Sequence, residues 1–218
     1  MRGALIEYGT DFLGPIPNVV IFQFNPETLT RNIEIPARPT GGAARESSSA
    51  GEPPIEKFTI KALFSAADHL NSNNPLARGF GVGPYLAALE KMARPETKGL
   101  LGAALDAVGS ALGLGGGSSD PTQSIPREKY PRIIFIWGLT RVLPVVIESL
   151  SITENQYDFL LNPVEAEVSI GMAVVPPSPC SDDKIAKGAF TYSETAKEAM
   201  AVLNLVNTVE QVVELIPF

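Results

Sequence analysis

The stretch "VEAEVSIGMAVV", residues 164–175, gives the clearest structural signal in the chain. Its apolar side chains alternate with polar or small ones, which is the period of a β-strand with one buried face. The face expected to be buried consists of Val164, Ala166, Val168, Ile170, Met172 and Val174. Glu165 and Glu167 lie on the other face. There, paired carboxylates indicate the solvated side of a sheet rather than a catalytic pair in a cleft.

Three other segments have strand character. In residues 55–64, "IEKFTIKALF", the alternating apolar residues are Phe58, Ile60, Ala62 and Phe64. In residues 145–153, the alternation predicts one face made of Val146, Glu148, Leu150 and Ile152. Residues 132–138, "RIIFIWG", form a near-continuous apolar run that is suited to burial on both faces. Together these segments predict an antiparallel sheet.

Two Asn-Pro pairs divide strand-like stretches. Short strands are expected at residues 5–8, 19–24 and 29–35, and Asn25-Pro26 separates the last two. Asn162-Pro163 stands directly before the stretch of residues 164–175. Because Asn and Pro both favour turns, we expect each pair to form a corner at an edge of the sheet.

Helices are predicted in two places. Pro84 marks a helix start and Pro95 its stop, and the apolar positions between them are Leu86, Leu89, Met92 and Ala93. A second helix is expected over residues 193–215, with Ser193 as its N-cap. Its predicted apolar stripe comprises Ala199, Leu203, Val206, Val213 and Ile216.

The sequence predicts one β domain with additions. Residues 37–54 contain few large apolar side chains, and residues 99–124 contain many glycines. We therefore expect both segments to be flexible insertions. The β domain is expected to span residues 1–175. Residues 176–218 then form a Pro-rich turn and a helix, which packs on the domain or on a neighbouring subunit. The fold class is mainly β (α+β), with flanking helices and a C-terminal helix.

Composition and charge limit the classes of partner. The 218 residues include 17 Lys and Arg against 24 Asp and Glu, for a net charge of -7. This balance argues against binding to nucleic acid or to an anionic membrane face. Residues 99–117 are apolar but rich in glycine and interrupted by Asp106, so we do not expect them to cross a membrane. The single cysteine, Cys180, and the lack of a signal-peptide pattern favour the cytoplasm.

Candidate chemical groups are few. One histidine, His69, and one cysteine provide too few ligands for a His/Cys metal site. Acidic residues follow Cys180, and they raise a thiol pKa rather than activate a nucleophile. The glycine-rich stretches "RGFGVGP" and "GLGGGSS" lack the Lys-Ser/Thr of a phosphate-binding loop. The sequence therefore predicts no catalytic residue, no cofactor and no metal site.

The order of four segments resembles a known family. The segments are "FQFNPETLTR", "IEKFTIKALF", "PRIIFIWG" and "VIESLSITENQYDFLLNPVEAEVSIGM". In this order they resemble the tube-domain family of contractile injection systems, the phage-tail-like particles. The similarity covers residues 4–175 without the two insertions. Its most specific part is "FLLNPVEAEV", because family members place a short turn there before an Ala-containing final strand.

This resemblance implies both a fold and a role. The fold would be an antiparallel β-sandwich or split barrel of the tail-tube type. Copies would form a hexameric ring in the baseplate, and the ring would join the central spike protein to the inner-tube protein beside other baseplate subunits. The matching residues are structural or interface candidates: Phe22, Phe24, Asn25, Pro26, Trp137, Gly138, Asn162, Pro163 and Ala166. Larger family members carry a peptidoglycan-binding LysM module, which the sequence after Val175 does not resemble.

Two other functions remain open at this point. The chain could be the main inner-tube subunit of such a particle, although tube subunits usually lack long insertions. It could also be a monomeric β-sandwich that binds a small molecule or carbohydrate in a pocket.

Overall fold

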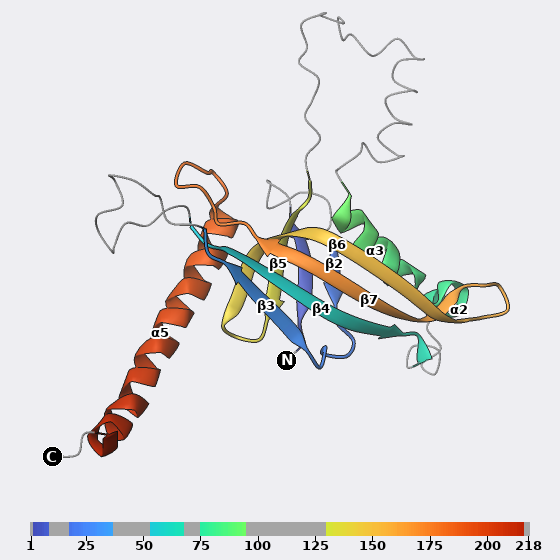
Figure 1. The fold of residues 1–218 in the computed structure, drawn as a ribbon. Helices are drawn as coiled ribbons and strands as arrows, with labels where there is room; N and C mark the ends of the chain where they lie inside the picture. The colour runs from blue at the N-terminus through green and yellow to red at the C-terminus, as the bar shows by residue number, and fades with distance from the viewer. Residues whose placement is uncertain (1, 9–17, 37–52, 68–74, 95–129, 216–218) are drawn as a thin grey trace, which may run out of the picture.

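A computed structural model of the protein describes residues 2–8, 18–36, 53–67, 75–94 and 130–215 (Figure 1). The strands are β1 (Ala4–Tyr8), β2 (Val19–Ile21), β3 (Leu29–Glu34), β4 (Ile55–Ser65), β5 (Arg132–Trp137), β6 (Arg141–Tyr157) and β7 (Pro163–Val174). The helices are α2 (Pro75–Phe80), α3 (Gly83–Ala93) and α5 (Lys184–Leu215). The mainly β (α+β) fold predicted from the sequence is thereby confirmed.

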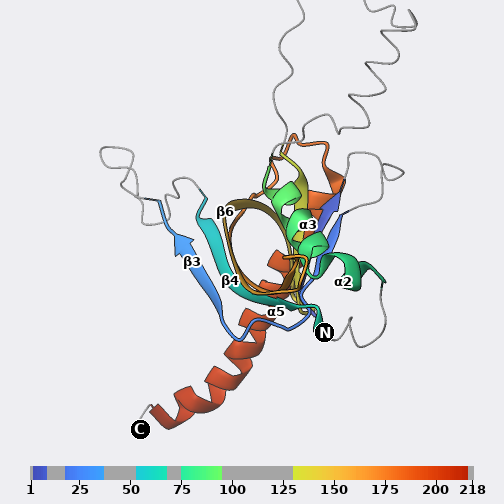
Figure 2. The ribbon, with the colours of Figure 1, turned by 90° about the vertical axis from the view of Figure 1, so that its right-hand side faces the viewer.

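The seven strands form one antiparallel sheet in the order β2-β1-β5-β6-β7-β4-β3. Seen along its strands, the sheet is strongly curved, with β3 and β4 on one side and α2 and α3 on the other (Figure 2). A backbone–side-chain bond connects two distant strands, because the Ser65 N–H donates to Gln23 Oε1 at 2.7 Å. Gln23 follows β2 and Ser65 ends β4, so this bond helps to hold the curvature.

The concave face of the sheet contains the core. Across β4 and β7, Phe58 pairs with Met172, Ile60 with Ile170, and Ala62 with Val168. All six side chains are buried, which confirms both predicted alternations. Ile133, Ile134 and Phe135 of β5 are buried in succession, as the apolar run predicts. Helix α3 contributes Leu86, Leu89 and Met92 to the core, and Pro84 lies in its first turn, also as predicted.

Strand β6 departs from its predicted alternation. Leu143, Val145 and Ile147 lie in the core. Farther along the strand, the residues that pack against the core are Leu150 and Ile152. The pairing with β7 shifts between Ile147 and Ser149, so Glu148 is an extra residue that reverses the phase of the side chains. The prediction that Val146, Glu148, Leu150 and Ile152 share one face is therefore wrong. Gly171 lies opposite this bulge, where a Cβ would approach Ser149 Oγ to 2.3 Å.

Helix α5 begins at Lys184, nine residues before its predicted start. Asp183 provides the cap, since its Oδ1 accepts a hydrogen bond from the Ala186 N–H at 2.9 Å. Ser193, the predicted N-cap, lies inside the helix and is fully buried against β6. Its hydroxyl donates to the Val142 carbonyl at 2.7 Å and accepts from the Val142 N–H at 2.8 Å. Val142 lies beyond the last β6–β7 pair, so Ser193 takes the place of a strand partner.

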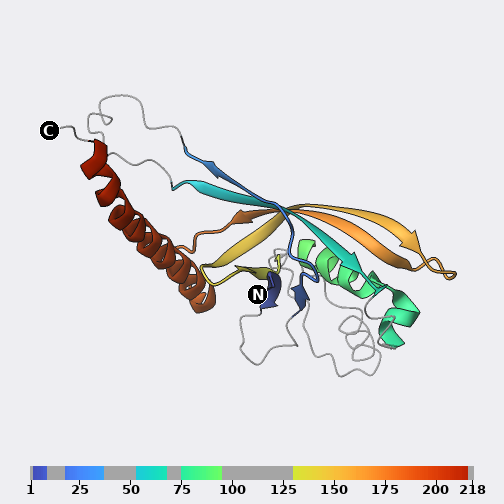
Figure 3. The ribbon, with the colours of Figure 1, turned by 90° about the horizontal axis from the view of Figure 1, so that it is seen from below.

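The contact stripe of α5 also differs from the predicted one. Its residues facing the sheet are Ala186, Phe190, Ser193 and Lys197. Ala199 and Leu203, from the predicted stripe, are exposed, while the side chains of Val206, Val213 and Ile216 lie outside the described part. At about 1.5 Å per residue the helix is about 48 Å long. Its C-terminal part extends away from the sheet (Figures 1 and 3).

The remaining predictions have mixed outcomes. Ile33 and Ile35 belong to the strand expected over residues 29–35, but β3 ends at Glu34, and the two side chains are 49% and 82% exposed. Nearly all of residues 37–54, all of residues 99–124 and His69 lie outside the described residues. Among the described helices, none combines the length and the apolar character needed to cross a membrane.

The contact between Ser193 and Val142 can be tested by Ser193→Ala. The substitution leaves the buried N–H and C=O of Val142 without a partner, so we expect a loss of about 1 to 3 kcal/mol in the free energy of unfolding. Urea denaturation followed by circular dichroism measures it. Thr195→Ala is the control, because the Thr195 hydroxyl is exposed and bonds only within the helix. The control should change stability by less than about 0.5 kcal/mol. Equal losses in the two variants would contradict the role of Ser193.

Candidate assembly surfaces

The site residues predicted from the sequence form two groups in the fold. One lies around the aromatic pair Phe22 and Trp137, and the other lies at the hairpin between β6 and β7. In the first group, Phe22 is fully buried and its ring lies 6.5 Å from that of Trp137. Gly3 fits against both rings, because a Cβ there would approach each of them to 2.8 Å. The Gly3 N–H donates to Asn25 Oδ1 at 3.1 Å and the Gly3 carbonyl accepts from the Phe22 N–H at 2.9 Å. Asn25 therefore fixes the N-terminus of the chain against the aromatic pair.

The other members of this group lie at turns. Gly138 has a φ of +69° in the turn between β5 and β6, a conformation that favours glycine. Phe24 and Pro26 line a hollow of about 470 Å³ beside Lys61 and Glu167. Phe24 is 48% exposed, so it does not share the burial of Phe22. The first Asn-Pro pair thus forms a corner between β2 and β3.

The second group lies at the hairpin that joins β6 to β7. We call residues 158–162 of this hairpin the hairpin tip. Asp158 organises the tip, because its Oδ1 accepts hydrogen bonds from the Leu160 and Asn162 N–H groups, both at 2.8 Å. Its Oδ2 accepts from Asn162 Nδ2 at 3.0 Å. These bonds, led by the one from the Asn162 side chain, hold the pKa of Asp158 below its usual value of 3.8.

The hairpin tip is attached to the short helices. Asn162 Nδ2 also donates to the Gly79 carbonyl at 3.0 Å, and the Val82 N–H donates to the Pro163 carbonyl at 2.8 Å. Gly81 has a φ of +57°, and a Cβ there would lie 2.0 Å from the Pro163 carbonyl oxygen. Ala166 is fully buried just beyond, opposite Phe64. The second Asn-Pro pair therefore fixes the base of the hairpin tip.

The hairpin tip presents large apolar side chains to solvent. Phe159 is 91% exposed, Leu161 78% and Leu160 60%. Leu161 has a φ of +62°, the left-handed region where a residue with a Cβ costs about 1 to 2 kcal/mol. Asparagine or glycine would adopt this turn at lower cost. An exposed leucine in a strained position indicates that its side chain has a use outside the monomer.

A second hollow lies at the other end of β6 and β7. We call it the Tyr8 hollow; it has a volume of about 450 Å³. It is lined by Tyr8, Tyr130, Pro131, Arg132, Ile133, Pro144, Val145, Val146, Val175, Pro176, Pro177, Ser178, Ser181, Asp183 and Ala186. Asp183 Oδ2 accepts from the Tyr8 hydroxyl at 2.9 Å and from Arg132 Nη1 at 3.2 Å. Burial, together with this bond to Asp183, raises the pKa of Tyr8.

Ion pairs attach α5 to the edge of the sheet. Lys197 Nζ donates to Glu194 at 2.8 Å and to Glu56 at 2.9 Å, and Glu56 also pairs with Arg31. Burial alone would lower the pKa of Lys197, but the hydrogen bonds to Glu194 and Glu56 outweigh it and raise the pKa. This cluster joins β3, β4 and α5. It lines a further hollow of about 320 Å³ with Ile33 and Phe190.

Beyond this cluster, α5 exposes a series of large apolar side chains. They are Met200, Val202, Leu203 and Leu205, each between 53% and 66% exposed. We call these four residues the α5 apolar segment. Among the described residues, the hairpin tip and the α5 apolar segment are thus two separate groups of exposed apolar side chains. Large apolar side chains exposed to this degree are common at protein–protein contacts.

Sequence reasoning found the hairpin tip only in part. The predicted site residues include Asn162, Pro163 and Ala166 but not Asp158, and residues 159–161 enter only as part of the quoted "FLLNPVEAEV". The signal was present, because "DFLLN" places three large apolar residues between two turn-forming ones. Gly3 and Gly81 left no comparable signal, since their importance depends on residues far away in the sequence. Within the described ranges, no three His, Cys, Asp or Glu side chains are arranged to hold a metal ion.

The pKa of Asp158 gives a direct test of the hairpin tip. Because the pKa is lowered, the stabilisation by these bonds is present above the usual value of 3.8 and is lost as the pH falls through the lower folded value. In an NMR titration, the Asp158 carboxyl should titrate below 3.8, and the Leu160 and Asn162 amides should shift with it. Asn162→Ala should raise the midpoint. A midpoint at or above 3.8 in the wild type would contradict this geometry.

The close approach of Gly81 to the Pro163 carbonyl predicts a large effect of Gly81→Ala. The added Cβ meets the backbone and the positive φ is strained, so the free energy of unfolding should fall by about 2 to 5 kcal/mol. Gly83→Ala is the matched control, since a Cβ at Gly83 meets no atom within 4 Å. Thermal and urea unfolding measure both variants. Similar stabilities would show that the contact does not hold the hairpin tip.

Comparison with known proteins adds no relationship. A scan of protein-family models finds none that matches the chain, and a search of curated proteins finds no matching sequence. The assembly surfaces are therefore interpreted from their geometry and from the order of the sequence segments.

Proposed function

We propose that the protein is a structural baseplate component of a contractile injection system. In this proposal six copies form a ring, and the ring joins the central spike to the inner tube. The protein works in the cytoplasm within the assembled particle and performs no chemical reaction. When the sheath contracts, the ring transmits the movement as part of the rigid tube and spike.

The α5 apolar segment is the observation that carries this proposal. A helix about 48 Å long is attached to the sheet through Ala186, Ser193 and Lys197 of its first half. The second half presents Met200, Val202, Leu203 and Leu205 to solvent. In a working monomer, these side chains would gain nothing from being apolar. Large apolar side chains exposed on a helix are common at contacts with another subunit.

The two ends of the sheet also support an assembling protein. Strands β2 and β3 are the outermost strands of the sheet, and Ile33 within β3 is exposed. Uncovered strand edges are a hazard for a monomer but are suitable joints between copies. In a ring, each subunit uses two different surfaces, one for each neighbour. The order of the sequence segments that resembles the tube-domain family agrees with such a role.

Native mass spectrometry and negative-stain imaging of the purified full chain test the ring. We expect a six-membered species that converts to monomer on dilution. A chain that remains monomeric in the presence of spike and tube proteins would overturn the proposal. Isolated particles provide the second measurement, the copy number. About six copies per particle agree with an adaptor ring, whereas many dozens would assign the chain to the main inner tube.

Substitutions on α5 test whether its apolar segment binds the spike or tube protein. Leu203→Ser with Leu205→Ser should leave the ring intact but reduce incorporation into particles about tenfold or more, because two interface leucines are lost. Ala201→Ser, an exposed position on the same helix, is the control and should incorporate normally. Quantitative immunoblotting of purified particles measures incorporation. Normal incorporation of the double variant would exclude the α5 apolar segment as the docking surface.

A further inference from the structure

We propose that the ring is closed by insertion of the hairpin tip of one copy into the Tyr8 hollow of the next copy. This inference rests on the ring assembly of the proposed function and specifies the contact that forms it. The occupant of the hollow is a second copy of the same chain. The two surfaces match in position, size and charge.

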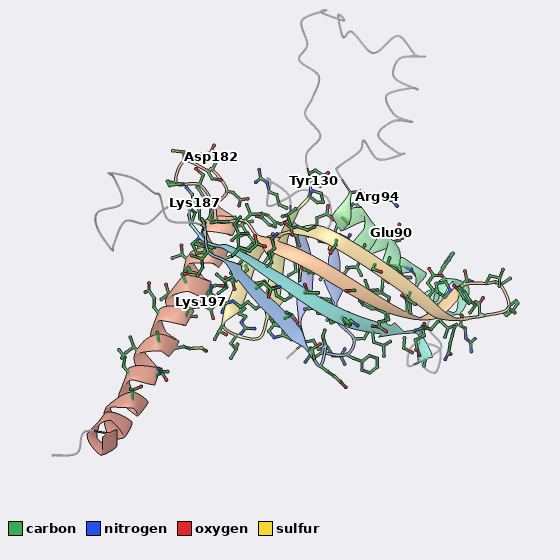
Figure 4. The ribbon with its side chains drawn as sticks, viewed as in Figure 1. Glu90, Arg94, Tyr130, Asp182, Lys187 and Lys197 are labelled. Atoms are coloured by element: carbon green, nitrogen blue, oxygen red, sulfur yellow. The ribbon has the colours of Figure 1, made fainter. Side chains whose placement is uncertain are left out.

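The positions of the two surfaces suit a head-to-tail contact. The hairpin tip connects the end of β6 to the start of β7. The Tyr8 hollow is lined by Pro144–Val146 at the start of β6 and by Val175–Pro177 just after β7. A protrusion and a hollow therefore lie at opposite ends of the same two strands. Asp182 and Lys187, beside the hollow, lie far from the hairpin in Figure 4. Insertion of the protrusion of one copy into the hollow of the next can repeat from copy to copy. It closes into a ring when the rotation between successive copies divides a full turn.

The hollow has the composition and size to receive apolar side chains. Prolines and valines make up much of its lining, with Tyr8 and Tyr130 at the side. Its volume of about 450 Å³ lies within the usual range of about 300 to 1,000 Å³ for binding pockets. Its main polar groups, Tyr8, Arg132 and Asp183, already bond one another. The apolar part of the hollow is thus the part left to bind a partner, and Phe159 and Leu161 match it.

The charges at the two ends are complementary. Residues 154–165 of the hairpin carry three carboxylates, Glu154, Asp158 and Glu165, and no basic side chain; α2, which is bonded to the hairpin through Gly79, adds the guanidinium of Arg78. Among the described residues that line the hollow or adjoin its lining in sequence on α5, the basic groups of Arg132, Lys184 and Lys187 exceed the carboxylates of Asp182 and Asp183 by one. Opposite net charges favour this pairing and steer the approach of the two copies. The hollow of about 320 Å³ near Lys197 is a poorer match, because its carboxylates, Glu56 and Glu194, are balanced by Arg31 and Lys197 and leave no net positive charge.

The strain at Leu161 permits a substitution that separates assembly from folding. Leu161→Asn suits the positive φ and should preserve or raise the stability of the monomer. The same change removes an apolar contact, so we expect the dissociation constant of the ring to increase about tenfold or more. Leu139→Asn is the matched control, because Leu139 is 66% exposed but lies in the turn between β5 and β6. Analytical ultracentrifugation measures both. An unchanged dissociation constant for Leu161→Asn would overturn the proposal.

A disulfide cross-link gives the decisive measurement, because the chain already has a cysteine at the hollow. Cys180 is exposed and lies between Ser178 and Ser181, which line the Tyr8 hollow. In the Leu160→Cys variant, mild oxidation should link successive copies from hairpin tip to Cys180, up to six chains on a non-reducing gel. Adding Cys180→Ser to the Leu160→Cys variant should leave at most linked pairs of chains. Leu139→Cys should not give linked chains of up to six copies.

The outcomes of this experiment are distinguishable. Linked chains of up to six copies support the contact. Rings that form without such links would overturn the contact and leave the ring itself in place. A chain that forms no ring at all would overturn both the contact and the proposed function.

Discussion

The antiparallel pairing of β6 with β7 is the constraint on which the rest of the structure depends. It runs from Val145 opposite Val174 to Tyr157 opposite Pro163, through the centre of the sheet. Its register sends Val168, Ile170 and Met172 into the core. A shift by one residue would turn every one of these side chains to solvent. The same pairing also sets where the hairpin tip and α5 leave the sheet.

Much of the sheet could be predicted from the sequence, because burial of one face imposes an alternation that is visible in the residues themselves. Strands β4 and β7 follow this rule without interruption, and so does the apolar run of β5. The phase change at Glu148 could not be predicted, since a bulge adds a residue without altering the local composition. The prediction of Ser193 as an N-cap is wrong for a related reason. A serine before an acidic residue resembles an N-cap, and only the fold shows that its hydroxyl bonds Val142.

The sequence predicts the parts of the candidate site that are formed by residues close together in the chain. It does not predict the parts that are formed by residues far apart in the chain. The two Asn-Pro pairs mark real corners, and Trp137 lies against Phe22 at one of them. The contact of Gly81 with the Pro163 carbonyl joins segments more than eighty residues apart, and no local pattern reports it. The Tyr8 hollow likewise forms from β1, β5, β6 and the start of α5. A surface of this kind exists only after the chain has folded.

The proposed ring requires both ends of the β6–β7 pair to serve assembly. Cryo-electron microscopy of the assembled protein tests it most directly. We predict a closed six-fold ring in which Phe159 of each copy lies against Pro177 and Val146 of the next. A two-fold dimer, or a ring in which the hairpin tips remain in solvent, would contradict the account.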